Sequence, residues 1–217
     1  MMLEHTTDDL RWFSAYLSDY LSALPEDAWT RPTGDRPQDW TLTELMAHLA
    51  SIAEIFNQAT EAALGNRPLV LEGLQERRDL RHWNAAQIAA RQGIPGLQLL
   101  SVWRAQIAAA ADRAATLSPA QAEATAFLPV YNRPARVIDF IDWQLSHAGI
   151  IHGAQVTRAM GDPPLWMGYP PDFTVRQIDR FMRHLSAAYW HDLAGAEDQI
   201  TLAFEIEGAG EWHILAA

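Results

Sequence analysis

The stretch WTLTELMAHLA, residues 40–50, carries the clearest helix signal in this chain of 217 residues. Thr41 and Glu44 form a capping-box pattern, in which each side chain accepts a hydrogen bond from the free backbone N–H group of the other residue. An apolar repeat at helical spacing follows, at Leu45, Leu49, Ile52 and Phe56. We therefore expect a helix that begins after Thr41 and ends near Gly65.

Similar helical patterns recur along the chain. Long helices are expected at about 7–24, 97–117, 134–160 and 175–193, with one or two short helices within 66–94. Thr174 is the expected cap of the last one. The pattern predicts an all-α fold, a four-helix bundle with an extra C-terminal helix.

Near the end of the chain, the spacing of the apolar residues changes from helical to alternating. From about residue 199, apolar and polar residues alternate around Gly208-Ala209-Gly210, which is typical of a short β-hairpin. A lone hairpin is marginally stable, so we expect it to pack on the bundle or on a partner chain, and its exposed edge favours a homodimer. We predict a bundle over residues 1–162 and an extension of helix plus hairpin over residues 163–217.

The composition argues against several classes of function. A formal net charge of −11 disfavours a nucleic-acid partner, because such proteins usually carry a basic patch. There is no apolar run of about 18 residues, and the first residues are acidic rather than basic and then apolar. We expect a cytoplasmic protein with no membrane partner.

The chain also lacks two nucleophiles. It contains no cysteine, and all 16 of its basic residues are arginine, so neither a thiol nor a lysine amine is present. Histidine, carboxylate, hydroxyl and a bound metal remain for catalysis. If the reaction involves a thiol, a cosubstrate must supply it.

Two histidines fall on or beside the apolar faces of predicted long helices. His48 lies three residues after Leu45, and His152 lies four residues before Val156. A single histidine in such a place is more often a hydrogen-bonded core residue than a metal ligand. Two of them in one bundle favour a metal site, since bundle cores build such sites from inward-facing side chains. Spacing alone leaves both interpretations open.

His147 lies five residues before His152. On a regular α-helix, five residues separate two side chains by about 140°, so these histidines would not share a face. The other histidines have no spacing partner, and we predict no role for His5, His82, His184, His191 and His213. Arg77, with Arg78 and Arg81, is expected to be a solvated surface rather than a contact to an acidic substrate.

The chain resembles the DinB-like family of four-helix bundles, which includes mycothiol-dependent maleylpyruvate isomerase. Residues 40–50 are similar to the W-[ST]-x-x-E-L-x-x-H-L-A signature of the second helix in that family, and residues 152–156, HGAQV, are similar to its H-x-G-Q-[IV] motif. With the order of helices, the resemblance covers about residues 5–162. It implies a divalent ion, zinc or nickel, held by His48 and His152 among other ligands.

The third ligand position implied by the resemblance falls on Ala148, which cannot bind a metal. Three alternatives remain. A π-bulge between residues 147 and 152, eased by Gly149, would bring His147 to the same face as a third ligand. A regular helix would leave two ligands plus water, or the site is vestigial and the histidines are packing residues.

Gln155, three residues after His152, would lie on the same face and could bind a cofactor or orient a ligand, or it could be a buried amide. Our functional hypothesis is a metal-dependent enzyme that activates a low-molecular-weight thiol or water for transfer, isomerisation or hydrolysis of a small apolar substrate. The alternative is a non-catalytic, dimeric bundle that binds a small ligand or responds to stress, with a vestigial metal site.

Overall fold

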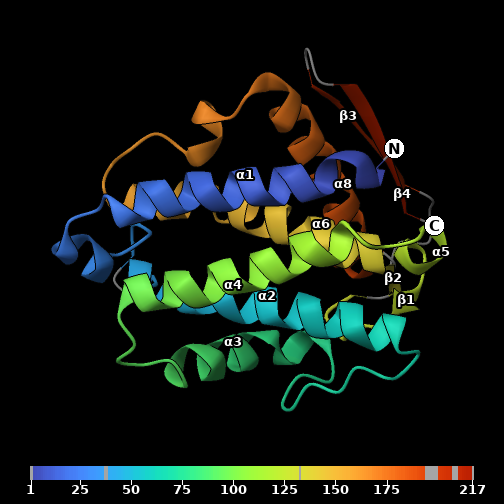
Figure 1. The fold of residues 1–217 in the computed structure, drawn as a ribbon, viewed down its shortest axis with the longest axis horizontal. Helices are drawn as coiled ribbons and strands as arrows, with labels where there is room; N and C mark the ends of the chain where they lie inside the picture. The colour runs from blue at the N-terminus through green and yellow to red at the C-terminus, as the bar shows by residue number, and fades with distance from the viewer. Residues whose placement is uncertain (1, 37–38, 132, 194–199, 207–209, 217) are drawn as a thin grey trace.

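The computed structural model describes residues 2–36, 39–131, 133–193, 200–206 and 210–216. Its centre is a bundle of four helical segments (Figure 1): α1 (Met2–Ser22), α2 (Leu42–Leu64), α4 (Gly96–Ala114) and a fourth that starts with α6 (Val137–Ser146). Helices α1 and α2 both pack on α4, and α6 packs on α2. The predicted all-α bundle with a terminal hairpin is confirmed.

Helix α2 begins as its sequence predicts. The Glu44 N–H group donates to Thr41 Oγ1 at 3.2 Å, and the Thr41 N–H group donates to Glu44 Oε2 at 2.7 Å. Gly65 follows the last helical residue. Most side chains of α2 are buried because α4 and α6 pack on it within the bundle and α3 covers it from outside. They include the predicted apolar positions Leu45, Leu49 and Phe56.

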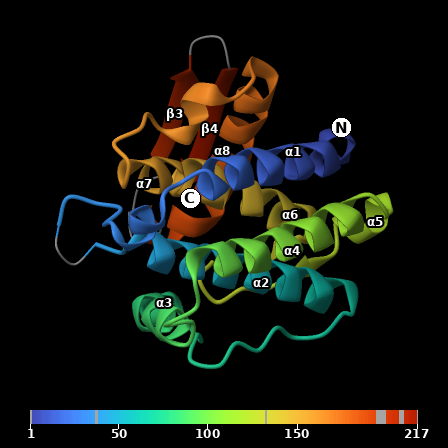
Figure 2. The same ribbon diagram turned by 60° about the vertical axis from the view of Figure 1, so that its left-hand side comes forward.

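Short elements join the bundle helices. They are η1 (Glu26–Thr30), η2 (Arg77–Asp79), α3 (Leu80–Ala89), α5 (Pro119–Ala122) and η4 (Leu165–Gly168), with strand β1 (Thr125–Ala126) paired to β2 (Ala135–Arg136). Helix α3 packs along α2, outside the bundle, in both views (Figures 1 and 2). Together η2 and α3 place polar side chains over one face of α2.

The fourth bundle segment is not one regular helix. It starts at Val137 rather than near residue 134, because residues 135–136 pair with β1. After α6 comes η3 (His147–Ile151), which is a π-helix, and then α7 (Gly153–Arg158). The π-helix lies between His147 and His152, two histidines that a regular helix would place on different faces.

Helix α8 (Pro171–Leu193) packs on α6. It begins earlier than predicted, so the expected cap Thr174 lies inside its first turn, where the threonine hydroxyl donates to the Pro170 carbonyl at 3.1 Å. Pro171 can start the helix because its missing N–H group would have no partner in the first turn.

Buried ion pairs hold α8 to α1 and α6. Arg180, only 3% exposed, donates to Asp9 of α1 at 2.6 Å and to Asp142 of α6 at 3.1 Å. Arg176 adds two bonds to Asp9, and Arg183 donates to Asp142 at 2.9 Å. Because both carboxylates are buried, losing one partner would leave charge uncompensated in the core.

The terminal hairpin consists of β3 (Ile200–Ile206) and β4 (Gly210–Ala216), paired antiparallel with Ile206 opposite Gly210. Strand β4 packs on α8 (Figure 2). The Trp212 indole N–H group of β4 lies 3.5 Å from Asp179. The predicted turn residues Gly208 and Ala209 lie outside the described residues. The division of the chain at residue 162 stays a prediction. Of the helices described, none combines the length and apolarity that a bilayer crossing requires.

The ion-pair network makes a prediction about stability. Asp142→Asn keeps the shape of the side chain but removes the charge that faces Arg180 and Arg183. We expect the free energy of unfolding, measured by urea denaturation, to fall by about 3 kcal/mol. Asp112→Asn is the control, because Asp112 pairs with Arg11 on the exposed surface and such a pair contributes about 0–1 kcal/mol. Equal losses in both variants would contradict a structural role for the buried network.

Candidate metal centre

Three histidines converge on one point of the bundle. His48 comes from α2, His147 begins the π-helix and His152 follows it directly. One nitrogen of each ring can be chosen so that all three lie within 4.8 Å of one another. His48 and His152 are buried, and His147 is partly exposed. All three are candidate metal ligands from the sequence, and the structure brings them together.

The π winding produces this convergence. The His152 N–H group donates to the His147 carbonyl at 3.1 Å, a bond that spans five residues instead of four. The extra residue lets the two imidazoles approach to 4.7 Å between ring centroids. The segment therefore has the winding of the π-bulge alternative and not that of a regular helix, while metal binding by these histidines stays a prediction. Ala148 is buried in the core.

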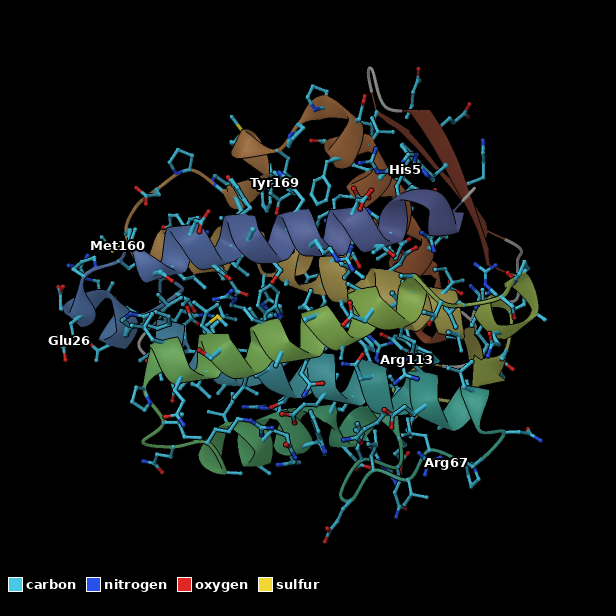
Figure 3. All side chains as sticks on the ribbon, viewed as in Figure 1. His5, Glu26, Arg67, Arg113, Met160 and Tyr169 are labelled. Carbon is cyan, nitrogen blue, oxygen red and sulfur yellow. The ribbon has the colours of Figure 1, made fainter. Side chains whose placement is uncertain are left out.

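Gly149 permits the π-helix to pack against its neighbours. The Tyr169 hydroxyl, from the segment that leads into α8 (Figure 3), donates to the Gly149 carbonyl at 3.0 Å. A Cβ atom on residue 149 would lie 2.9 Å from that hydroxyl and 3.2 Å from the Phe13 ring. Glycine is required here for close approach rather than for flexibility.

The spacing of the nitrogens suits a metal ion. His48 Nε2 and His147 Nε2 lie 3.2 Å apart, near the roughly 3.3 Å between two nitrogens bound tetrahedrally to one zinc ion. The largest separation among the three ligand atoms, 4.8 Å, exceeds two metal–nitrogen bonds end to end, about 4.2 Å. All three can bind one ion once the most distant pair of nitrogens approaches by about 0.6 Å or more. The residues present therefore fit a divalent ion.

Burial keeps these histidines neutral. It lowers the pKa of His48 well below the usual value, and the neighbouring His152 lowers it further. The pKa of His147 falls well below its usual value for the same reason, with His152, His48 and His184 adding to the effect. Burial also lowers the pKa of His152, against a smaller opposite effect of its bond to Gln155. Neutral imidazole is the form that binds metals.

Gln155 fixes the tautomer of His152. Its carbonyl oxygen Oε1 lies 2.5 Å from His152 Nδ1 and can only accept, so Nδ1 carries the proton. The lone pair of the ring is then on Nε2. His48 Nδ1 is buried and has no hydrogen-bond partner among the described residues. Gln155 therefore contacts His152 at Nδ1, the ring nitrogen that does not carry the lone pair. A direct contact of Gln155 with a cofactor stays a prediction.

A cavity of about 260 Å³ opens beside the three histidines. It is a little smaller than the roughly 300–1,000 Å³ typical of small-molecule sites. Its walls are mostly apolar, from Trp40, Ile52, Ile55, Phe56, Leu74, Leu80, Leu128, Val130 and Ile151. Arg77 and Asn84 also line it, and no Asp or Glu among the described residues does. Arg78 and Arg81 are exposed, whereas Arg77, expected to be a solvated surface residue, is partly buried and lines the cavity.

Sequence analysis missed His184 and Tyr131. Both are buried and line the cavity, and their side chains are hydrogen-bonded to each other at 2.9 Å. Apolar periodicity could not reveal His184, because Gln177 and Arg180, which share its buried face of α8, are themselves polar. Tyr131 precedes β2 in a loop, where no periodicity could reveal its place.

A comparison with models of protein families gave a match. Residues 10–156 match the family model described as "Mycothiol maleylpyruvate isomerase N-terminal domain". The match includes the three histidines and Gln155, and it ends before η4 and α8. Searches of curated proteins and of solved structures gave no match.

The role of Gly149 is testable. Gly149→Ala should lower the free energy of unfolding by about 1–3 kcal/mol, because the new methyl group overpacks the contact with Tyr169 and Phe13. Adding Tyr169→Phe removes the atom nearest to the new Cβ. The double variant, measured by urea denaturation, should therefore lose less stability than the sum of the single variants. Strict additivity would contradict the close contact.

The buried histidines also predict an acid-sensitive fold. Burial, helped by His152, lowers the pKa of His184 to about 3, from about 6.5 in an unfolded chain. Between these values the unfolded chain binds one more proton than the folded chain. This group therefore makes the free energy of unfolding fall by about 1.4 kcal/mol for each pH unit below about 6.5.

His184→Gln should accordingly make this pH dependence shallower in the metal-free protein, measured by urea denaturation between about pH 6.5 and pH 5. The exposed His5 supplies the control, since His5→Gln should leave the slope unchanged. If His184→Gln and the unaltered protein have the same slope, His184 is not buried in its neutral form.

Proposed function

Because this chain belongs to the mycothiol maleylpyruvate isomerase N-terminal domain family, a DinB-like family, we propose that it is a metal-dependent enzyme whose ion is held by His48, His147 and His152. The observation that carries the proposal is the convergence of three neutral imidazoles beside a cavity. A divalent ion bound in this way keeps open coordination positions and lowers the pKa of a thiol or water bound there. Zinc or nickel is the proposed ion.

The chain's own residues support a thiol cosubstrate. With no cysteine and no lysine, the protein has neither of these side chains to serve as the nucleophile. The family description names mycothiol, so we propose that mycothiol or a similar small thiol supplies the sulfur. In the part of the chain that the structure describes, no carboxylate lines the cavity to oppose a bound thiolate.

The cavity walls favour a small and largely apolar substrate. Aliphatic and aromatic side chains from α2, η3 and the segments around η2 and β1 form most of its lining. Arg77 and Asn84 provide a place for one acidic or polar group of the substrate. The proposed reaction is transfer, isomerisation or hydrolysis of such a molecule. The homodimer and the cytoplasmic location stay predictions.

Metal content tests the proposal. Protein purified without a histidine tag should contain about one zinc or nickel ion per chain by elemental analysis. His48→Ala, His147→Ala and His152→Ala should each abolish stoichiometric binding, because two imidazoles bind weakly. Gln155→Leu should weaken binding by about 10–100-fold. His82→Ala, which alters an exposed histidine of α3, should change nothing.

A cobalt-substituted sample separates thiol from water as the activated molecule. Adding mycothiol should produce a thiolate-to-cobalt charge-transfer band that the His152→Ala variant lacks. Metal content that is sub-stoichiometric and unaffected by the three substitutions would favour the alternative, a metal-free bundle that binds a small apolar ligand without turnover. Stoichiometric metal without the band would favour water.

A further inference from the structure

A second cavity, of about 410 Å³, is lined by residues of β2, α6, α8 and β4. Its volume falls within the roughly 300–1,000 Å³ typical of small-molecule sites. Among the residues that the structure describes, it shares no lining residue with the cavity beside the three histidines. The second cavity is therefore a separate place at which the protein can bind a small molecule.

Part of the lining of the second cavity is apolar. Trp143 of α6 and Trp212 of β4 contribute indole rings, and Met182 and Ala187 of α8 add aliphatic surface. The polar atom of each indole is an N–H donor, and that of Trp143 is buried with no hydrogen-bond partner among the described residues. This part of the lining suits a ligand with an aromatic or aliphatic body.

The charged part of the lining is mainly cationic. Arg133, Arg136 and Arg183 line the second cavity, and Asp139 is the one carboxylate among its described lining residues. This surplus of arginine occurs in a chain whose formal net charge is −11. The charges that line the cavity therefore favour an anion, although the chain as a whole is acidic.

Asp139 holds two of these arginines in fixed positions. Arg136 Nε and Nη2 donate to its carboxylate at 2.8 and 2.9 Å, and Arg183 Nη1 donates to it at 2.9 Å. Asp139 is 8% exposed, and each of its oxygens already accepts at least one of these bonds. The carboxylate therefore orients the two guanidinium groups, and little of it is presented to a ligand.

The ion pairs leave N–H groups on these arginines. A guanidinium carries five N–H groups, one on Nε and two on each Nη. Arg183 donates once from each of its nitrogens, to Asp139, Asp142 and Asp179. One N–H group therefore remains on each Nη. Neither Asp142 nor Asp179 lines the cavity, so these carboxylates fix the guanidinium from outside the space that a ligand would fill.

We propose that the second cavity binds a small organic anion, in which an aromatic or aliphatic body carries a carboxylate. The carboxylate accepts hydrogen bonds from the arginines, whose planar groups of N–H donors match its geometry. The body of the ligand packs against the indoles of Trp143 and Trp212. This binding site goes beyond the proposed function and does not depend on the metal.

Benzoate and benzamide test the proposal by ligand-detected NMR titration. The two molecules have nearly the same shape, but only benzoate is charged. In the unaltered protein, benzoate should bind about tenfold more tightly than benzamide. Arg136→Gln should weaken benzoate about tenfold and leave benzamide unchanged, because it removes a charged donor. Arg133→Gln, at an exposed position, should also weaken benzoate selectively.

Trp212→Leu tests the apolar part of the lining. This substitution removes ring surface but no charge, so it should weaken benzoate and benzamide by similar factors, about two- to tenfold. The preference for benzoate over benzamide should remain. An unchanged affinity of both ligands would contradict the contact of the ligand body with Trp212.

Two further arginines supply the controls. Arg104→Gln changes the net charge equally, but Arg104 is exposed on α4 and does not line the second cavity. Arg77→Gln controls for the place of binding, because Arg77 lines the cavity beside the histidines. Neither substitution should change the preference for benzoate. All titrations use protein treated with EDTA, so that benzoate does not bind an ion at the candidate metal centre.

A preference that is lost in Arg136→Gln and kept in both controls supports the proposal. Equal affinities of benzoate and benzamide in the unaltered protein would overturn it. So would a preference that both Arg136→Gln and Arg133→Gln retain, or one that Arg77→Gln abolishes, because benzoate would then bind in the cavity beside the histidines. None of these results bears on metal content, which tests the proposed function separately.

Discussion

The hydrogen bond from the His152 N–H group to the His147 carbonyl is the interaction on which the candidate site depends. Because it spans five residues, it turns His147 towards His48 and His152 instead of about 140° away from His152, as a regular helix would. The bond persists because the segment is packed on both sides. Gly149 admits Tyr169 and Phe13 at distances that any side chain on residue 149 would prevent. The extra residue in the π-helix thus lets His147 take the third ligand position that Ala148 would occupy in a regular helix.

Burial then keeps these histidines in the neutral form that can bind a metal. Exposed imidazoles would titrate near neutral pH, whereas here burial lowers the pKa of all three and keeps their lone pairs available. The described residues that line the cavity beside them are mostly apolar and include one arginine but no carboxylate, although the chain as a whole is strongly acidic. Acidic residues are instead placed where arginines neutralise them, as between α1, α6 and α8. The ion pairs that hold the helices together are therefore separate from the three histidines and the cavity beside them.

Helix α8 links these two parts of the molecule. It lies beyond the matched family segment, which ends at residue 156, yet it contributes both the arginines of the buried network and His184 of the cavity wall. Arg180 and His184 are one helical turn apart, so the ion pairs that fix the helix on α1 and α6 also fix the imidazole. The extension is therefore part of the cavity rather than an appendage to it. Residues outside the matched segment, such as His184, accordingly help to shape the cavity.

The sequence by itself determined the helices, the start of α2 at its capping box and the identities of the three histidines, because these follow from local periodicity and local hydrogen bonds. It left the winding from His147 to His152 open. That choice depends on Phe13 and Tyr169, which approach Gly149 from distant parts of the chain. The roles of Tyr131, His184 and Arg77 were equally hidden, because a cavity wall is assembled from segments that only tertiary packing brings together. Local interactions fixed which residues could act, and long-range packing decided which of them meet.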